Sequence, residues 1–169
     1  MAEFPLDSAP RRGLHFPVSS RCRSLLYWGP VVLWTLLIFW GSTDLGSERR
    51  TSRFIGPFLR WLAPGVSDAT VESVQYTVRK AGHVSEYAVL AVLLWRALRR
   101  PVRDDRRPWS WRTAAATLAL AALYAVSDEY HQSFVATRYA SALDVIIDTV
   151  GALAGLGAVW ALGRWRRRW

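Results

Sequence analysis

Ionisable side chains gather at three places in the sequence, each at one end of a long apolar segment. Carboxylates and imidazoles exchange protons and ligate divalent metals, and cations hold phosphate groups. Residue types suited to acid–base or phosphate chemistry therefore recur at related positions. The first group is Lys80, His83, Glu86 and Tyr87; the second is Asp128, Glu129, His131 and Gln132; the third is Arg138, Asp144 and Asp148.

Helical spacing places members of these groups on shared faces. His83 and Glu86 are three residues apart, and Asp144 and Asp148 are four apart. The aspartate stripe continues into a G-x-x-x-G pattern at 151–155. Because small residues let two helices approach closely, we expect both aspartates to point into a helix bundle.

Two of the acids, Glu86 and Asp148, lie inside apolar segments. A carboxylate there costs on the order of 2.5–3.5 kcal/mol on insertion scales. Either a structural salt-bridge network or a functional site would explain the groups together, and a divalent metal is a candidate cofactor of such a site. The catalytic candidates are His83, Glu86, Asp128, Glu129, His131, Asp144 and Asp148, and the substrate-binding candidates are Lys80, Tyr87, Gln132 and Arg138.

Four apolar segments must position these groups, and each is long enough for a hydrocarbon core about 30 Å thick. We expect residues 67–79, capped by Ser67 or Asp68, to run directly into the second segment. Residues 54–64 are typical of an interfacial helix. The predicted fold is an all-α membrane domain over 24–163, with four transmembrane helices at 25–41, 81–98, 113–130 and 142–163, a short interfacial helix in the first outer loop, a disordered tail at 1–23 and a basic tail at 164–169.

The charge distribution predicts an orientation. The chain has a formal net charge of +9. Of its 22 Lys and Arg residues, 15 lie in the two tails and between the second and third segments, and 7 lie in the other two loops. The positive-inside rule therefore predicts a multi-pass protein of the bacterial cytoplasmic membrane with both termini in the cytoplasm. The basic residues flank apolar segments, so lipid headgroups are the expected partners and nucleic acid is not.

Several site types are excluded by the sequence. Cys22 is the one cysteine, so an intramolecular disulfide and a cysteine metal site are both ruled out. There is no G-x-S-x-G nucleophile motif and no phosphate-cradling glycine loop. The residues therefore indicate a functional site, but they do not identify the reaction.

The combination of motifs resembles the VanZ-like family of bacterial membrane proteins, which is named after a protein associated with teicoplanin resistance. The resemblance covers about 25–163 and rests on K-x-x-H-x-x-E-Y at 80–87, D-E-x-H-Q at 128–132, Arg138, D-x-x-x-D-x-x-G-x-x-x-G at 144–155, and the Gly41–Ser42 step. It implies a four-span architecture and a role in the cell envelope. Asp148 departs from the family, which often has Asn there.

Three functional hypotheses remain open at this point. The first is an enzyme acting on a lipid or a lipid-linked envelope precursor at the outer leaflet. The second is a non-enzymatic scaffold or envelope modulator in which the ionisable groups are structural. The third is an ion-coupled carrier, which intramembrane acids favour but four short segments without an inverted repeat do not.

Overall fold

The fold is all-helical in the residues that the computed structural model describes, which are 20–43, 48–101, 105–136, 138 and 140–169. Within these ranges there are five helices and no strand. The all-α prediction is therefore confirmed. The helices are α1 (Ser20–Gly41), α2 (Glu48–Leu62), α3 (Asp68–Arg99), α4 (Trp111–Gln132) and α5 (Ala142–Trp165).

The helix boundaries agree closely with the segments expected from the sequence, except that α2 begins at Glu48, before the predicted interfacial segment 54–64. Residues 67–79 and the second apolar segment form one continuous helix, α3, whose N-cap Ser67 accepts a hydrogen bond from the Thr70 amide. At the N-terminal end, α1 begins at Ser20 and so takes in the last residues of the segment predicted as a tail. The rest of that tail, 1–19, lies outside the described residues.

Two of the five helices are long and apolar enough to cross a membrane by themselves. These are α1, from Ser24 to Gly41, and α5. The helices α3 and α4 do not meet the same criterion, because the charged and polar residues of the predicted site interrupt their apolar runs. Length and apolarity therefore support two of the four predicted spans.

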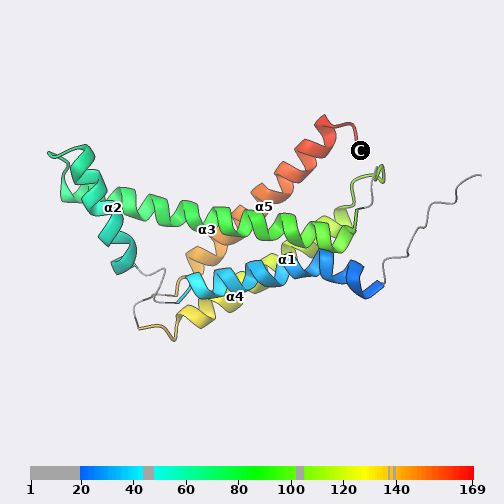
Figure 1. The fold of residues 1–169 in the computed structure, drawn as a ribbon, viewed down its shortest axis with the longest axis horizontal. Coiled ribbons are helices and arrows are strands. Elements are labelled where there is room, and N and C mark those ends of the chain that lie inside the picture. Colours follow the sequence, from blue (N-terminus) through cyan, green and yellow to red (C-terminus); the bar gives the residue numbers. More distant parts are fainter. Residues whose placement is uncertain (1–19, 44–47, 102–104, 137, 139) are drawn as a thin grey trace, which may run out of the picture.

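The longest helix, α3, organises the molecule (Figure 1). It runs along the long axis, and α5 crosses it, packs against it and also contacts α4. Helix α1 packs against the C-terminal half of α3, with the Trp34 indole donating to the Glu86 carbonyl (2.9 Å). Helix α2 packs against the N-terminal part of α3 beyond the bundle, where Ser52 donates to the Gln75 side chain (3.0 Å).

The crossing of α3 and α5 depends on two glycines. A Cβ added to Gly151 would lie 2.5 Å from the Val84 carbonyl oxygen, and one added to Gly155 would overlap the Ala88 carbonyl. Only glycine fits at such a contact, as the G-x-x-x-G pattern predicts. The close approach places the N-terminal turns of α5 beside residues 80–88 of α3.

The core lies where α3, α4, α5 and α1 meet, and it combines alanines with larger apolar side chains. Small residues let the helices pack closely, and the larger side chains fill the remaining volume. The buried apolar residues of this core include Val31 and Ile38 of α1, Tyr87, Leu90, Ala91 and Leu94 of α3, Ala121 and Ala125 of α4, and Ala152 and Leu156 of α5.

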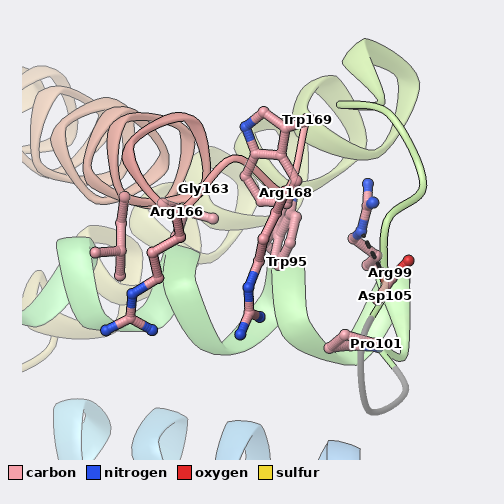
Figure 2. A pocket seen from close by; sticks show the side chains of 10 residues that line it. Trp95, Arg99, Pro101, Asp105, Gly163, Arg166, Arg168 and Trp169 are labelled. Carbon is pink, nitrogen blue, oxygen red and sulfur yellow. Dashed lines mark hydrogen bonds and ion pairs between the residues drawn. The ribbon is translucent and has the colours of Figure 1, made fainter.

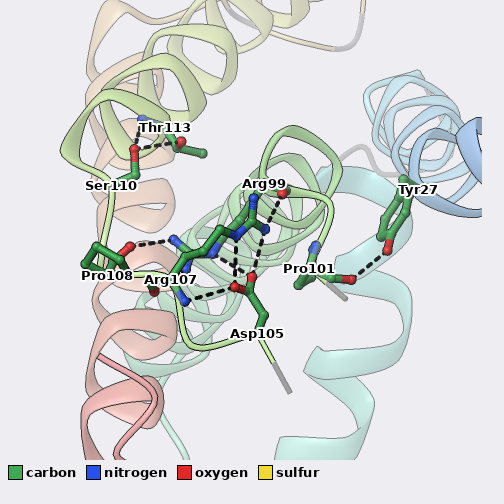
Figure 3. A network of polar contacts seen from close by, with 8 residues as sticks. All are labelled: Tyr27, Arg99, Pro101, Asp105, Arg107, Pro108, Ser110 and Thr113. Atoms are coloured by element: carbon green, nitrogen blue, oxygen red, sulfur yellow. Dashed lines mark hydrogen bonds and ion pairs between the residues drawn. The ribbon is translucent and has the colours of Figure 1, made fainter. Parts of the chain in front are cut away.

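A compact charge network closes the connection between α3 and α4. We call Arg99, Asp105 and Arg107 the basic-end network (Figure 3). Asp105 Oδ2 accepts from Arg99 Nε (3.2 Å) and Arg107 Nη2 (2.8 Å), and Asp105 Oδ1 accepts from the Arg107 amide (3.1 Å) and Nε (2.8 Å). The Arg99 guanidinium also donates to the backbone carbonyls of Pro108 and Arg107.

Trp169 packs over this end of the bundle. Trp169 folds back so that its ring lies 5.8 Å from that of Trp95, and the Arg99 guanidinium lies 5.2 Å from each ring (Figure 2). The Trp169 indole donates to the Trp160 carbonyl (3.2 Å). There is no room for a Cβ on Gly163, because the Trp169 ring occupies that space. The end of the predicted basic tail is therefore packed against α3 and α5.

Candidate functional site

The predicted site residues lie together at the end of the bundle where α4 ends and α5 begins. Helix α3 contributes Lys80, His83, Glu86 and Tyr87 from its middle turns, and α4 and α5 contribute residues of their last and first turns. Arg138 comes from the connection between α4 and α5. We call the eleven residues the polar cluster: Lys80, His83, Glu86, Tyr87, Asp128, Glu129, His131, Gln132, Arg138, Asp144 and Asp148.

Two side-chain pairs, each ending on an aspartate, join α3 to α5. Lys80 Nζ contacts Asp144 Oδ1, and His83 Nδ1 lies 3.1 Å from Asp148 Oδ1. Lys80 and His83 are one turn apart on α3, and Asp144 and Asp148 are one turn apart on α5. Because the two helices cross in close contact, each residue of one helix lies opposite one of the other. The Asp148 side chain is completely buried, and the His83 side chain is 12% exposed. Both aspartates therefore face the bundle, as their spacing predicts.

Asp128 joins α4 to the end of α1. Its Oδ2 atom accepts a hydrogen bond from the Ser42 hydroxyl (2.8 Å) and one from Gln132 Nε2 (3.1 Å). All three residues are buried. The spacing of Asp128 and Gln132, four residues on one helix, brings them together, whereas Ser42 comes from 86 residues away.

Glu129 and Arg138 attach the α4–α5 connection to the cluster. Glu129 Oε2 accepts a hydrogen bond from the backbone amide of Ser141 (2.7 Å), the residue that caps α5. Arg138 Nη2 donates to the carbonyl of Gly41 at the end of α1 (2.7 Å). Burial lowers the pKa of Arg138, and the Asp128 and Glu129 carboxylates oppose that shift, so the guanidinium stays charged.

The other three members of the cluster have different surroundings. The half-buried Glu86 carboxylate is within electrostatic range of His83, Asp128 and Arg138. The Tyr87 side chain is completely buried, with its ring 6.3 Å from that of Tyr124. His131 stacks on Phe39 of α1, with ring centroids 4.2 Å apart. Its ring therefore packs against α1, and it makes no hydrogen bond to a carboxylate in the part of the chain that the structure describes.

Several buried polar atoms of the cluster lack a hydrogen-bond partner among the described residues. A buried polar group without a partner costs about 1–3 kcal/mol, so native proteins pair nearly all of them with protein, water or ligand. Such a concentration in one place marks the position where an additional polar molecule would be stabilised. The atoms are Tyr87 OH, Asp128 Oδ1, Glu129 Oε1, His131 Nδ1, Arg138 Nε and Asp148 Oδ2.

The cluster has acidic, basic and cationic groups within one small volume, which suits proton transfer and the binding of a polar headgroup. Its geometry is less suited to a metal. In the part of the chain that the structure describes, no group of three or more His, Cys, Asp or Glu side chains is arranged to hold a metal ion. One histidine is paired with Asp148 and the other is stacked on Phe39.

The set of site candidates predicted from the sequence does not include the contribution of α1. Ser42 fixes one oxygen of Asp128, and the Gly41 and Thr43 carbonyls accept from Arg138 (2.7 and 3.5 Å). A serine directly after an apolar helix resembles an ordinary helix end. The Gly41–Ser42 step, which carries part of the family resemblance, is the signal in the sequence that points to it.

Comparisons with known proteins place this arrangement in a family. No curated protein and no solved structure matches the chain. A family model described as VanZ/LLP1 matches residues 27–163, which include α2 to α4, most of α1 and α5, and every member of the polar cluster. The match covers well over half of the sequence. The chain therefore belongs to the VanZ/LLP1 family.

Proposed function

We propose that the chain is an integral protein of the bacterial cytoplasmic membrane whose polar cluster binds, and acts on, the headgroup of a lipid or a lipid-linked envelope precursor. In this proposal the chain crosses the membrane four times with both termini in the cytoplasm. The cluster then lies on the extracytoplasmic side, because the arginine-rich tails and the α3–α4 connection occupy the other side.

Membrane insertion is supported by the surface of α1 as well as by its apolar sequence. Large apolar side chains on this helix are exposed, such as Leu25 (70%), Leu33 (61%) and Trp40 (65%). Exposed apolar surface of this extent is unfavourable in water and favourable in lipid. Phe54, with 78% exposure, belongs to an apolar face of α2 that suits the membrane interface.

The observation that carries the site proposal is the concentration of unpartnered buried atoms. Asp128, Glu129 and Asp148 each have one carboxylate oxygen that is hydrogen-bonded within the protein and one without a hydrogen-bond partner among the described residues. Carboxylate oxygens accept hydrogen bonds from hydroxyl and amine groups, and Arg138 Nε supplies a donor for phosphate. A headgroup that combines hydroxyls with phosphate matches both kinds of atom.

His83 is the residue best placed for proton transfer. With its Nδ1 donating to Asp148, the ring has a fixed orientation and Nε2 is left as the proton acceptor. Lys80, paired with Asp144 nearer the end of the bundle, supplies a second cation for an anionic substrate. These residues give the proposal separate roles for a base, for carboxylates that accept hydroxyl groups and for cations.

The test compares substrate binding with folding in the same variants. The full chain is purified in nanodiscs and titrated with a polyprenyl pyrophosphate, and the unfolding temperature of each variant is measured. Glu86→Gln and Asp128→Asn should each weaken binding at least tenfold without lowering the unfolding temperature, and His83→Ala should weaken binding at least tenfold as well. Ser85→Ala is the matched control, because Ser85 lies among them on α3 but is exposed and bonds only to the Ala81 carbonyl. Full binding by all three variants would contradict the proposal.

A second candidate function is a scaffold in which the cluster holds the helices together. The observation that favours it is that Asp128, Glu129 and Arg138 each bond to the end of another helix. In that case the same substitutions would lower the unfolding temperature and the amount of protein in the membrane together. The VanZ/LLP1 assignment makes teicoplanin susceptibility a suitable cellular readout for either candidate, with expression of each variant measured in parallel.

A further inference from the structure

An apolar groove runs between α4 and α5 at the end of the bundle far from the polar cluster. Its volume is about 500 Å³, within the range of about 300–1,000 Å³ typical of small-molecule pockets. Its lining is aliphatic and aromatic, and a Cβ on Gly157 would meet no atom within 4 Å, so the groove is open at that position. The principal lining residues are Trp109, Trp111 and Leu118 on one side and Leu153, Gly157 and Trp160 on the other.

Two arginines flank the mouth of this groove by helical register. Arg164 is four residues beyond Trp160 and seven beyond Gly157, so it continues the lining face of α5 past the tryptophan. Arg112 is three residues before Ala115, another lining residue, on the first turn of α4. Both side chains are exposed. Within the described ranges neither guanidinium makes an ion pair or a hydrogen bond, in contrast to Arg99 and Arg107.

We propose that this groove binds one anionic phospholipid, with an acyl chain between α4 and α5 and the phosphate at Arg112 and Arg164. The apolar lining matches the acyl chain, and the exposed Trp111 is of a residue type enriched at membrane interfaces. The two unpaired cations match the phosphate in charge. This site is separate from the polar cluster, and it uses none of the residues to which the proposed function assigns a role.

A lipid fits this groove better than a second copy of the chain. Glycine and alanine in an apolar groove would also admit a helix, as in small-residue helix pairs. A symmetric pair of chains packed through this face, however, would bring the same arginines of both copies together, and like charges at an interface are unfavourable. The positive charges of Arg112 and Arg164 therefore favour an anionic lipid over a second copy of the chain.

The test measures retention of defined lipids by the purified full chain in detergent, read by native mass spectrometry. Phosphatidylglycerol should bind more tightly than phosphatidylcholine with the same acyl chains. The variant Arg112→Gln/Arg164→Gln should weaken phosphatidylglycerol binding about thirtyfold, since each basic side chain contributes about fivefold near an anionic phosphate. Gly157→Leu should abolish the preference by filling the groove from a position where the side chain has room. Glycerol phosphate, which has no acyl chain, should not compete.

Two control variants separate these effects from general ones. Arg53→Gln/Arg60→Gln removes the same charge from exposed positions of α2, away from the groove, and Ala158→Leu adds the same side chain at the neighbouring exposed position of α5. Both should retain phosphatidylglycerol as the wild type does. The proposal is overturned if the two lipids bind equally, if the arginine variant binds normally, or if Gly157→Leu converts a dimer to a monomer while lipid retention is unchanged.

Discussion

The basic-end network and the polar cluster both bury charged side chains against α3, but they differ in how completely those charges are paired. In the network, each oxygen of Asp105 accepts two hydrogen bonds from arginine nitrogen atoms or the Arg107 amide. In the cluster, Asp128 and Asp148 each leave one buried oxygen without a partner among the described residues. The contrast lies in the hydrogen bonding, since Asp105 is buried like Asp128 and Asp148, although its partner Arg107 is exposed.

This difference indicates different roles for the two regions. A buried carboxylate whose oxygens are fully bonded to arginine gives a fixed connection between chain segments, and here it joins the end of α3 to the start of the α4 connection. A buried carboxylate with a free oxygen gains stability when another donor arrives. Burial of charge alone does not distinguish the two cases, whereas counting the partners of each atom does.

The largest expected effect is on the network. Asp105→Asn leaves the buried Arg99 guanidinium without its carboxylate, and breaking a buried ion pair in this way costs about 3–5 kcal/mol. Thermal unfolding of the detergent-solubilised protein should show a clear loss of stability. Asp68→Asn, which removes an exposed partner of Arg60, should cost less than about 1 kcal/mol. Equal effects of the two substitutions would remove the basis for calling the network structural.

A smaller effect is expected where the C-terminus covers the network. Trp169→Ala removes the ring that packs on Trp95 and Arg99, and Gly163→Ala places a methyl group where that ring lies. Each should cost about 2 kcal/mol, below the range for a fully buried tryptophan because Trp169 is partly exposed. The double variant should be no less stable than Trp169→Ala alone, because both changes disrupt the same contact. Additive losses in the double-mutant cycle would contradict this explanation.

Acid should weaken the network more gradually. Hydrogen bonds from Arg107, and then the charge of Arg99, hold the pKa of Asp105 well below its ordinary value. Its carboxylate therefore stabilises the fold above the unfolded-state pKa of about 4, and that contribution declines as the pH falls below it. Between pH 5 and pH 3 the wild type should lose part of its advantage over Asp105→Asn. A stability difference between the two proteins that stays constant over this range would show that Asp105 does not titrate as described.

The smallest effect on stability is expected in the polar cluster, from the same chemical change. Asp128→Asn keeps an oxygen for the Ser42 and Gln132 hydrogen bonds and removes a charge that has no ion-pair partner among the described residues. The free energy of unfolding should therefore change by less than about 1 kcal/mol. Thermal unfolding beside Asp105→Asn gives a matched comparison of one substitution in two regions. A loss as large as that of Asp105→Asn would mean that the cluster is structural as well.

The sequence by itself determined the helices and the residues that share their faces. The start of α3 at its cap Ser67 and the inward stripe of Asp144 and Asp148 follow from capping and from the helical period, which act over a few residues. The family resemblance also follows from the residues alone, and the VanZ/LLP1 match confirms it. Apolarity was a weaker guide to the membrane spans. The polar site residues in α3 and α4 lower the mean hydropathy of these helices, which is the property that identifies α1 and α5 as candidate spans.

Only the tertiary structure decided which groups are partners. His83 is three residues from Glu86 on its own helix, yet it pairs with Asp148, 65 residues away, because Gly151 lets α5 approach α3 closely. The Ser42 bond to Asp128 spans 86 residues and depends on where α1 ends beside α4. Such pairings are set by the crossing of packed helices, which depends on the volumes of all the side chains between them and not on any local spacing.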